Sequence, residues 1–264
     1  MSKYLELFKG SFNDSINEKT KPENKPYIGY SLTEGKMAYT VVPAKEEPVT
    51  LEAVDLGLPS GRLWANMNVG ATSPEDPGLY FAWGDTVGYE EGHYFGPENY
   101  KWVDPNNFTK YTKYNDSDRR TQLLSVDDAA TINMGSEWRM PTQEDFIELC
   151  NNTTITAVVA DDNNNIYNLE FGSGDTYYYR QSSVPDIPDY IDSYNLKFIK
   201  GIKFTGVNNN SIILPPNICS NNYWGSDLSG GLPSAINFNG VVLTTLLSDF
   251  VGRSSGTTVR AVKA

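Results

Sequence analysis

The stretch 54–83, VDLGLPSGRLWANMNVGATSPEDPGLYFAW, constrains the fold more than any other part of this chain. Its density of glycine, proline, tryptophan and asparagine suits neither an amphipathic helix nor a simple hairpin. Such a run is typical of a compact, loop-rich β domain in which each turn is specified by its own residues. Domains of this kind usually present loops to a partner, so the stretch favours a binding function.

Size and charge limit the classes of partner. The 264 residues are enough for one large or two modest domains, and 17 Tyr, 11 Phe and 5 Trp supply bulk for a core or an adhesive surface. The net charge of −12 opposes nucleic-acid binding, because phosphate recognition needs clustered Lys and Arg. No apolar run approaches the ~18 residues of a spanning helix, so we expect no membrane insertion.

The start of the chain and its cysteines indicate a compartment. Residues 1–25 contain no apolar segment followed by a small-residue cleavage site, so we expect synthesis and folding in a cytoplasm. Cys150 and Cys219 could pair, but in a cytoplasm we expect free, buried thiols. We predict no cofactor.

Composition changes near residue 50, and we predict an N-terminal arm and β-hairpin over 1–50. The arm, 1–25, is polar, and we expect its spaced apolar residues to dock on another protein. The segment 26–43 predicts a hairpin with its turn at 33–36. A lone hairpin is marginal in water and has unpaired edges, so we expect attachment and a homodimer or homotrimer. The predicted attachment and oligomerisation residues are Tyr4, Leu7, Phe8, Tyr27, Ile28, Tyr30, Met37 and Tyr39.

Residues 51–264 are predicted to form one domain with two helices among short strands. Ser125 is the expected N-cap of the first helix, with Gly135 just beyond its end. Thr142 is the expected N-cap of the second, and Asp145 would complete a capping-box variant. The predicted strands are 155–159, 166–171, 196–204, 211–214, 235–238, 241–246 and 257–262. The Asn runs at 163–165 and 208–210 predict turns.

Several motifs of this region occur in a familiar order: LYFAWGD at 79–85, WRMPTQED at 138–145, YWGSD at 223–227 and VRAV at 259–262. They resemble the DUF1566 and formylglycine-generating-enzyme-like group, which is common in Bacteroidetes and their phages. The resemblance covers roughly residues 54–262. It implies an α+β, C-type-lectin-like domain with a twisted antiparallel sheet, two helices, long loops and chain ends close together. The residues expected to be structural are Trp64, Trp83, Trp138, Arg139, Pro141 and Trp224.

The hairpin segment separately resembles short segments near the start of virion structural proteins in crAss-like phages. That resemblance implies that residues 1–50 bind the major capsid protein or another virion structural protein. The chain would then sit at the particle surface after assembly in the host cytoplasm.

The residues bear on three classes of enzyme. Formylglycine-generating chemistry needs a close cysteine pair near the chain end, and neither Cys150 nor Cys219 matches that pattern. His93, the sole histidine, lies in an acidic loop with no Gly-x-Ser-x-Gly elbow, so we interpret it as a solvated loop residue. A carboxylate-pair glycosidase stays open, because 33 acids place some pairs at suitable separation by chance.

Ligand binding was considered with and without metal. The sequences at 96–99 and 223–227 only partly match the triplets with which C-type lectins hold calcium, and the acidic turn 161–163 is better interpreted as solvated. We predict no metal site. Metal-free sugar binding would use aromatic faces in two Tyr- and Asn-rich loops, although these side chains could instead pack the loops or a subunit interface. The candidates are Tyr94, Tyr100, Trp102, Tyr111, Tyr177 and Tyr179.

The sequence therefore favours a non-enzymatic phage virion protein, a head fibre or tail fibre that displays an adhesin domain for a host-surface glycan. The alternative is a bacterial secreted or surface carbohydrate-binding module of the same fold. An enzyme of unknown type ranks third.

Overall fold

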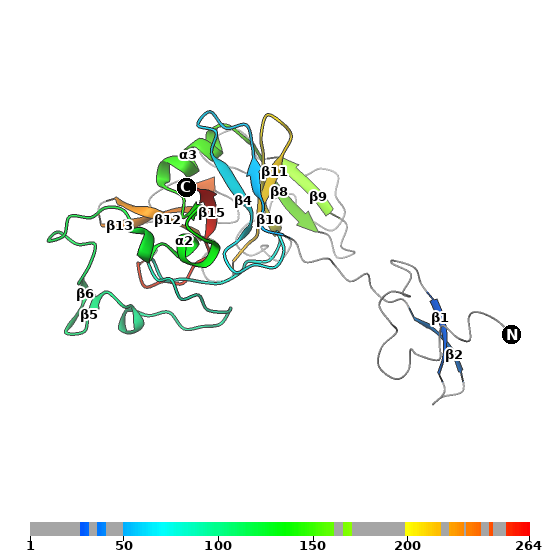
Figure 1. The fold of residues 1–264 in the computed structure, drawn as a ribbon, viewed down its shortest axis with the longest axis horizontal. Coiled ribbons are helices and arrows are strands. Elements are labelled where there is room, and N and C mark those ends of the chain that lie inside the picture. Colours follow the sequence, from blue (N-terminus) through cyan, green and yellow to red (C-terminus); the bar gives the residue numbers. More distant parts are fainter. Residues whose placement is uncertain are drawn as a thin grey trace. The chain divides into compact units, whose positions relative to one another are not determined.

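The structure is a computed structural model that describes residues 27–31, 36–40, 50–160, 166–170, 199–217, 222–229, 231–238, 243–244 and 252–264. The chain divides into two compact units, Met1–Pro48 and Val49–Ala264. Few helices and several antiparallel sheets make the described part broadly α+β (Figure 1). The predictions for Tyr4, Leu7, Phe8, Tyr177, Tyr179, Cys219, the acidic turn 161–163 and the Asn turn 163–165 lie outside the described residues.

The first unit contains a two-stranded antiparallel sheet. Strand β1 (Tyr27–Ser31) pairs with β2 (Lys36–Thr40), so that Tyr30 lies opposite Met37. The predicted hairpin is confirmed at the level of the backbone. Lys36 belongs to the second strand and not to the turn, because it pairs with Ser31.

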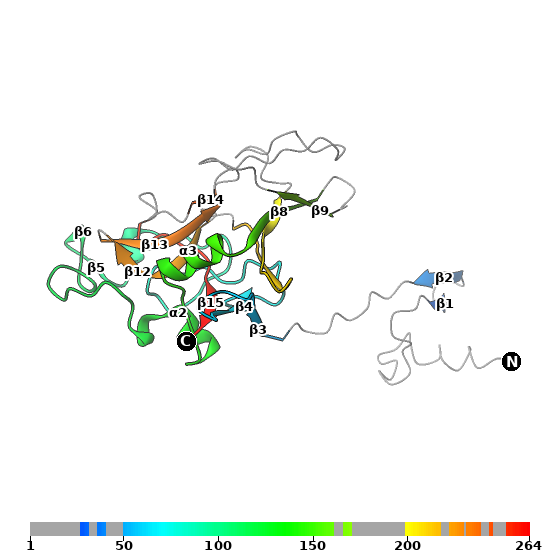
Figure 2. The same cartoon turned by 90° about the horizontal axis from the view of Figure 1, so that it is seen from above.

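The second unit begins and ends in one four-stranded sheet, with the order β3-β4-β15-β7. Its strands are β3 (Ala53–Asp55), β4 (Leu63–Asn68), β15 (Arg260–Lys263) and β7 (Trp138–Arg139). All pairings are antiparallel, and β4 and β15 lie side by side in both views of the ribbon (Figure 2). The first and last strands of this unit are therefore neighbours of the same strand, β4.

A second four-stranded antiparallel sheet has the order β11-β10-β8-β9. It consists of β8 (Thr154–Ala160), β9 (Ile166–Glu170), β10 (Ile199–Thr205) and β11 (Ser211–Leu214). The sequence predicted each of these strands. The predicted turn at 208–210 is also confirmed, with Asn209 in the left-handed region at φ 67°.

Two smaller sheets complete the second unit. In the first, β12 (Asn222–Ser229) pairs with β13 (Leu232–Phe238), and β13 pairs with β14 (Leu243–Thr244). In the second, β5 (Val103–Asp104) pairs with β6 (Asn107–Tyr111). The sequence did not predict β12 as a strand. Its register shifts between Trp224 and Leu228, so the strand lacks a simple alternating pattern.

The first predicted helix begins later than expected. Ser125–Asp127 forms a short 3-10 turn, η3, and α2 spans Ala129–Met134 with Asp128 as its N-cap. The prediction of Ser125 as N-cap was wrong because the Asp128 carboxylate accepts hydrogen bonds from the backbone N–H of Thr131 and of Met140. Gly135 ends the helix at φ 101°, as expected.

The second predicted helix, α3 (Gln143–Asn151), has the expected capping box between Thr142 and Asp145. The Asp145 carboxylate also accepts bonds from Arg139 Nη1 at 2.7 Å and Arg62 Nε at 3.0 Å. Burial alone would raise the pKa of Asp145, but these donors and the Thr142 N–H lower it below 3.8. The motif at 138–145 therefore joins β7 to the start of α3.

The centre of the second unit is held by two buried indole groups that bond in opposite directions. Trp83 Nε1 donates to the carbonyl of Gly225 at 2.9 Å, and Trp224 Nε1 donates to the carbonyl of Phe81 at 2.8 Å. Phe81 also exchanges two backbone bonds with Thr257. We call this arrangement the tryptophan clasp. It joins three segments far apart in the sequence: two contain the motifs at 79–85 and 223–227, and the third, at Thr257, lies just before the motif at 259–262.

A buried cation, Arg260, lies on β15. The Arg260 guanidinium is fully buried and donates to Asn68 Oδ1, the carbonyl of Ala65 and the carbonyl of Ile213. Burial lowers the pKa of Arg260 to about 10. Three neutral acceptors from β4 and β11 thus fix the position of β15.

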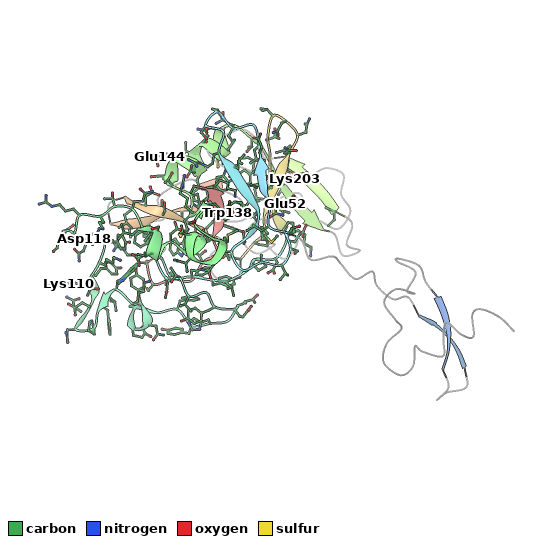
Figure 3. All side chains as sticks on the ribbon, viewed as in Figure 1. Glu52, Lys110, Asp118, Trp138, Glu144 and Lys203 are labelled. Atoms are coloured by element: carbon green, nitrogen blue, oxygen red, sulfur yellow. The ribbon has the colours of Figure 1, made fainter. Side chains whose placement is uncertain are left out.

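Some charged residues lie at the periphery of the second unit, whereas others, such as Arg260 and Asp145, are buried. Figure 3 places Lys110, Asp118 and Glu144 at the edge of the second unit and Trp138 within it. All four tryptophans expected to be structural, Trp64, Trp83, Trp138 and Trp224, are buried.

The clasp makes a prediction about two buried tryptophans. Trp64 Nε1 has no hydrogen-bond partner among the described residues, whereas Trp224 Nε1 has one. Trp224→Phe should therefore lower the free energy of unfolding more than Trp64→Phe, by roughly 1–3 kcal/mol. Urea unfolding of the two variants measures this difference. An equal or larger loss in Trp64→Phe would contradict the role of the clasp.

Asp145 makes a prediction about acid stability. Because its folded-state pKa lies below 3.8, its ionised form stabilises the fold above about pH 4, and that contribution is lost as the pH falls through the folded-state value. Asp145→Asn should cost about 2 kcal/mol at pH 7 and progressively less below pH 4. Urea unfolding across this range tests it. Glu144→Gln, an exposed acid in the same turn, is the control, and a pH-independent cost for Asp145→Asn would refute the account.

Candidate functional site

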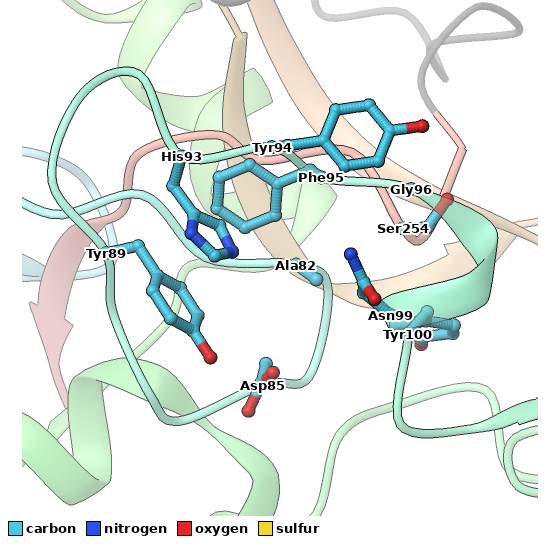
Figure 4. Close-up of a pocket in the computed structure, with 10 residues that line it drawn as sticks. All are labelled: Ala82, Asp85, Tyr89, His93, Tyr94, Phe95, Gly96, Asn99, Tyr100 and Ser254. Atoms are coloured by element: carbon cyan, nitrogen blue, oxygen red, sulfur yellow. The ribbon is translucent and has the colours of Figure 1, made fainter.

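A pocket of about 360 Å³ opens beside the clasp, on the loop that follows Trp83. Its size falls in the range of small-molecule sites. In Figure 4 the rings of Tyr89, His93 and Phe95 group on one side, and Asn99, Tyr100 and Ser254 lie on the other. The lining residues are Ala82, Asp85, Tyr89, His93, Tyr94, Phe95, Gly96, Asn99, Tyr100 and Ser254.

One wall of the pocket is a packed aromatic cluster. The His93 imidazole stacks on Tyr89 with ring centroids 3.7 Å apart and planes 8° apart. Phe95 stands edge-on to both, 4.9 Å from His93 and 5.8 Å from Tyr89. Edge-to-face and stacked pairs of this kind hold one another in place. The wall is therefore built before any ligand arrives.

Polar groups with unused bonding capacity face the same space. Asp85 Oδ1 accepts from the backbone N–H of Thr86 at 2.8 Å, but within the described chain no hydrogen bond reaches Oδ2. The amide of Asn99 and the hydroxyls of Tyr89 and Ser254 likewise make no side-chain hydrogen bond among the described residues. A ligand that offers several donors and acceptors would find partners here.

The pocket is tied to the clasp by three contacts. Tyr80 and Tyr89 exchange backbone hydrogen bonds at 2.9 and 3.0 Å, which closes the loop between them. The Tyr100 hydroxyl donates to the carbonyl of Trp83 at 2.9 Å. Gly256, next to Thr257 of the clasp, packs directly under the Phe95 ring. Displacement of the clasp would therefore displace the pocket walls.

Two of the predicted ligand-binding residues line the pocket. Tyr94 is 66% exposed at its rim, and a hydrogen bond to Glu98 raises the pKa of its hydroxyl. Tyr100 is buried, and its ring forms part of the pocket lining. Desolvation raises the pKa of its hydroxyl.

The structure places Trp102 and Tyr111 outside the lining. Cations of the protein lie over their ring faces: Lys101 is 4.2 Å and Lys113 5.0 Å from the Trp102 ring, and Arg253 is 4.1 Å from the Tyr111 ring. These rings support Tyr100, to which both are edge-on. The faces of both rings are used in packing within the loops, which the sequence analysis gave as the alternative to sugar binding.

Sequence reasoning missed most of the lining. His93 is exposed, as predicted for a loop residue, but it also stacks in the aromatic wall. The spacing of Tyr89, His93 and Phe95 in one short loop was a usable signal. Ser254 was not accessible to such reasoning, because the fold brings it in from more than 150 residues further along the chain.

Family models, curated proteins and solved structures were compared with this chain, and none of them matches. Within the described ranges, no helix combines the length and apolar character needed to span a bilayer. In the same residues, His, Cys, Asp and Glu side chains form no group of three or more that could hold a metal ion. Cys150 is a free, partly buried thiol.

The contact between Gly256 and Phe95 gives a prediction about the aromatic wall. A Cβ at Gly256 would overlap the Phe95 ring, so Gly256→Ala should turn Phe95 away from His93. Because His93 is the sole histidine, its ring protons give isolated NMR signals that report this change.

The control is Gly252→Ala, where a Cβ would meet nothing closer than Ser254 Oγ at 4.0 Å. We expect the His93 signals to shift clearly in Gly256→Ala and to stay near the wild-type position in Gly252→Ala. Unmoved signals in Gly256→Ala would show that the wall does not depend on this contact.

Proposed function

We propose that the chain is a non-enzymatic structural protein of a phage virion, a head fibre or tail fibre. Residues 51–264 would form a C-type-lectin-like adhesin domain that binds a host-surface glycan. Residues 1–50 would attach the chain to the major capsid protein or another virion protein and join copies of it.

The division of the chain into two units supports this arrangement. The sheet of the first unit has two strands, and a sheet of that size is marginal in water unless another surface covers it. Its outer edges offer backbone donors and acceptors to a partner strand. A second copy of the chain or a capsid protein would supply that strand.

The placement of the ends of the second unit supports a domain displayed on a tether. Strands β3 and β15 both pair with β4, so the chain enters and leaves this unit in one sheet. Close chain ends and a twisted antiparallel sheet with two helices are also what the resemblance to C-type-lectin-like domains implies.

The observation that carries the proposal is the pocket. Aromatic rings form one wall, and a carboxylate, an amide and two hydroxyls with free bonding capacity face the same space. Pyranose rings offer apolar C–H faces and several hydroxyl groups, which match these two kinds of surface. Weak binding by each copy would suffice, since display of many copies raises avidity by about 10²–10⁴.

The same pocket favours one other candidate. A bacterial surface or secreted carbohydrate-binding module would use the same rings and polar groups. The two candidates differ in where the protein resides and agree on what it binds.

Adhesion predicts competition for the host surface. Purified full-length chain should reduce adsorption of phage particles to host bacteria, and Asn99→Ala should weaken this competition at least tenfold. Phe108→Ala, an exposed apolar residue outside the pocket, should compete like the wild type.

Antibodies against the chain supply the second readout. Gold labelling of purified particles is expected at the particle surface. Unlabelled particles would reject the virion assignment, and labelled particles with no competition by the wild-type chain would reject adhesion.

A further inference from the structure

The charge of the pocket lining narrows the class of ligand. Among the ten lining residues, Asp85 is the one acid, and Lys and Arg are absent from the set. The same loop carries Glu90, Glu91 and Glu98, and the whole chain has a net charge of −12. An anionic sugar such as a uronic acid would meet repulsion here, whereas a cation would be attracted.

The geometry of Asp85 leaves one oxygen for a ligand. Oδ1 accepts from the backbone N–H groups of Thr86 and Val87 and lies 3.8 Å from Lys101 Nζ. These contacts fix the carboxylate in orientation, and all of them fall on Oδ1. Oδ2 is therefore positioned to accept a hydrogen bond, and a charged N–H donor gives the strongest one.

The two protein cations near the pocket are already engaged. Lys101 lies between Asp85 and Asp127 and over the Trp102 ring. The Arg253 guanidinium is buried under Tyr111 and donates to the carbonyls of Gly231 and Tyr114. The Arg253 donors are therefore used within the protein, and the Lys101 ammonium is shared between two carboxylates.

Aromatic rings in this region attract cations. Three rings behind the pocket, Trp83, Trp102 and Tyr111, each have a Lys or Arg over one face. Among the described residues, no such cation lies over Tyr89, Tyr94 or Phe95, which line the pocket. An ammonium group near electron-rich rings and a carboxylate is attracted by both.

We propose that the pocket selects an amino sugar, a pyranose with a free, positively charged amine. This inference rests on the glycan-binding function proposed above and names its ligand class. The amine binds Asp85 Oδ2 beside the aromatic wall. The Asn99 amide and the Ser254 hydroxyl receive sugar hydroxyls, and the exposed Tyr94 ring covers the apolar face of the sugar.

The test compares probes that differ in one group, on the full-length chain. Isothermal titration with methyl glucosaminide, its N-acetyl form, methyl glucoside and methyl glucuronide should give the tightest binding for the free amine. We expect at least a tenfold preference over the acetylated and neutral sugars and no binding of the glucuronide. Added salt should reduce the preference.

The matched variants are Asp85→Asn and Glu75→Gln, which change the net charge equally. Asp85→Asn keeps an acceptor for the Thr86 N–H and should lose the amine preference to within threefold, while its melting temperature reports folding. Glu75 is exposed and outside the pocket, so its variant should bind like the wild type.

The outcomes separate this inference from the proposed function. Neutral sugar binding without amine preference, or a preference that survives in Asp85→Asn, would overturn the ligand class and leave glycan binding intact. Nα-acetyl-lysine methylamide carries a free side-chain amine but no sugar ring. Equal binding of this probe would also overturn the inference, because the sugar ring would then not be recognised. Failure of every sugar to bind would reject the ligand class and the glycan-binding part of the proposed function, whereas the virion assignment is tested by the gold labelling.

Discussion

The reciprocal bonds of Trp83 and Trp224 determine much else in the second unit. Each indole fills buried volume and donates its N–H to the backbone beside the other indole. Buried N–H groups are costly when unpaired, so both rings have one preferred orientation. Phe81 and Thr257 extend the contact into backbone pairing, and Arg260 fixes the neighbouring strand. Three distant segments are thereby held in one arrangement with few regular elements.

The pocket follows from that arrangement. Tyr100 bonds to the carbonyl of Trp83, and Phe95 rests on Gly256 one residue before the clasp. The long loop between Trp83 and Trp102 can thus carry a preformed site although it has little secondary structure. A site ordered in advance loses less entropy on binding, which suits weak sugar ligands displayed in many copies. Asp85 adds a directed charge, because its backbone partners occupy only one of its two oxygens.

Local features could be predicted from sequence, and features made by distant residues could not. The capping box of Thr142 and Asp145 and the turn at Asn209 depend on neighbours within a few residues. Ser125 was a plausible cap by the same rules, but Asp128 prevailed because it also binds the N–H of Met140. The aromatic candidates for ligand binding show most clearly what local sequence could not predict. Nothing local distinguishes Tyr94, whose ring is open, from Trp102, whose face is covered by Lys101 and Lys113.

Hydrogen exchange of the two indole protons tests most directly whether the clasp holds this unit together. If it does, the Nε1 protons of Trp83 and Trp224 exchange only through global unfolding, with the same opening free energy as the amides that pair β4 with β15. If the Trp83 Nε1 proton exchanged through a local opening, far faster than the amide protons that pair β4 with β15, the account would be contradicted. The loop would then open independently of the core, and its pocket would not be preformed.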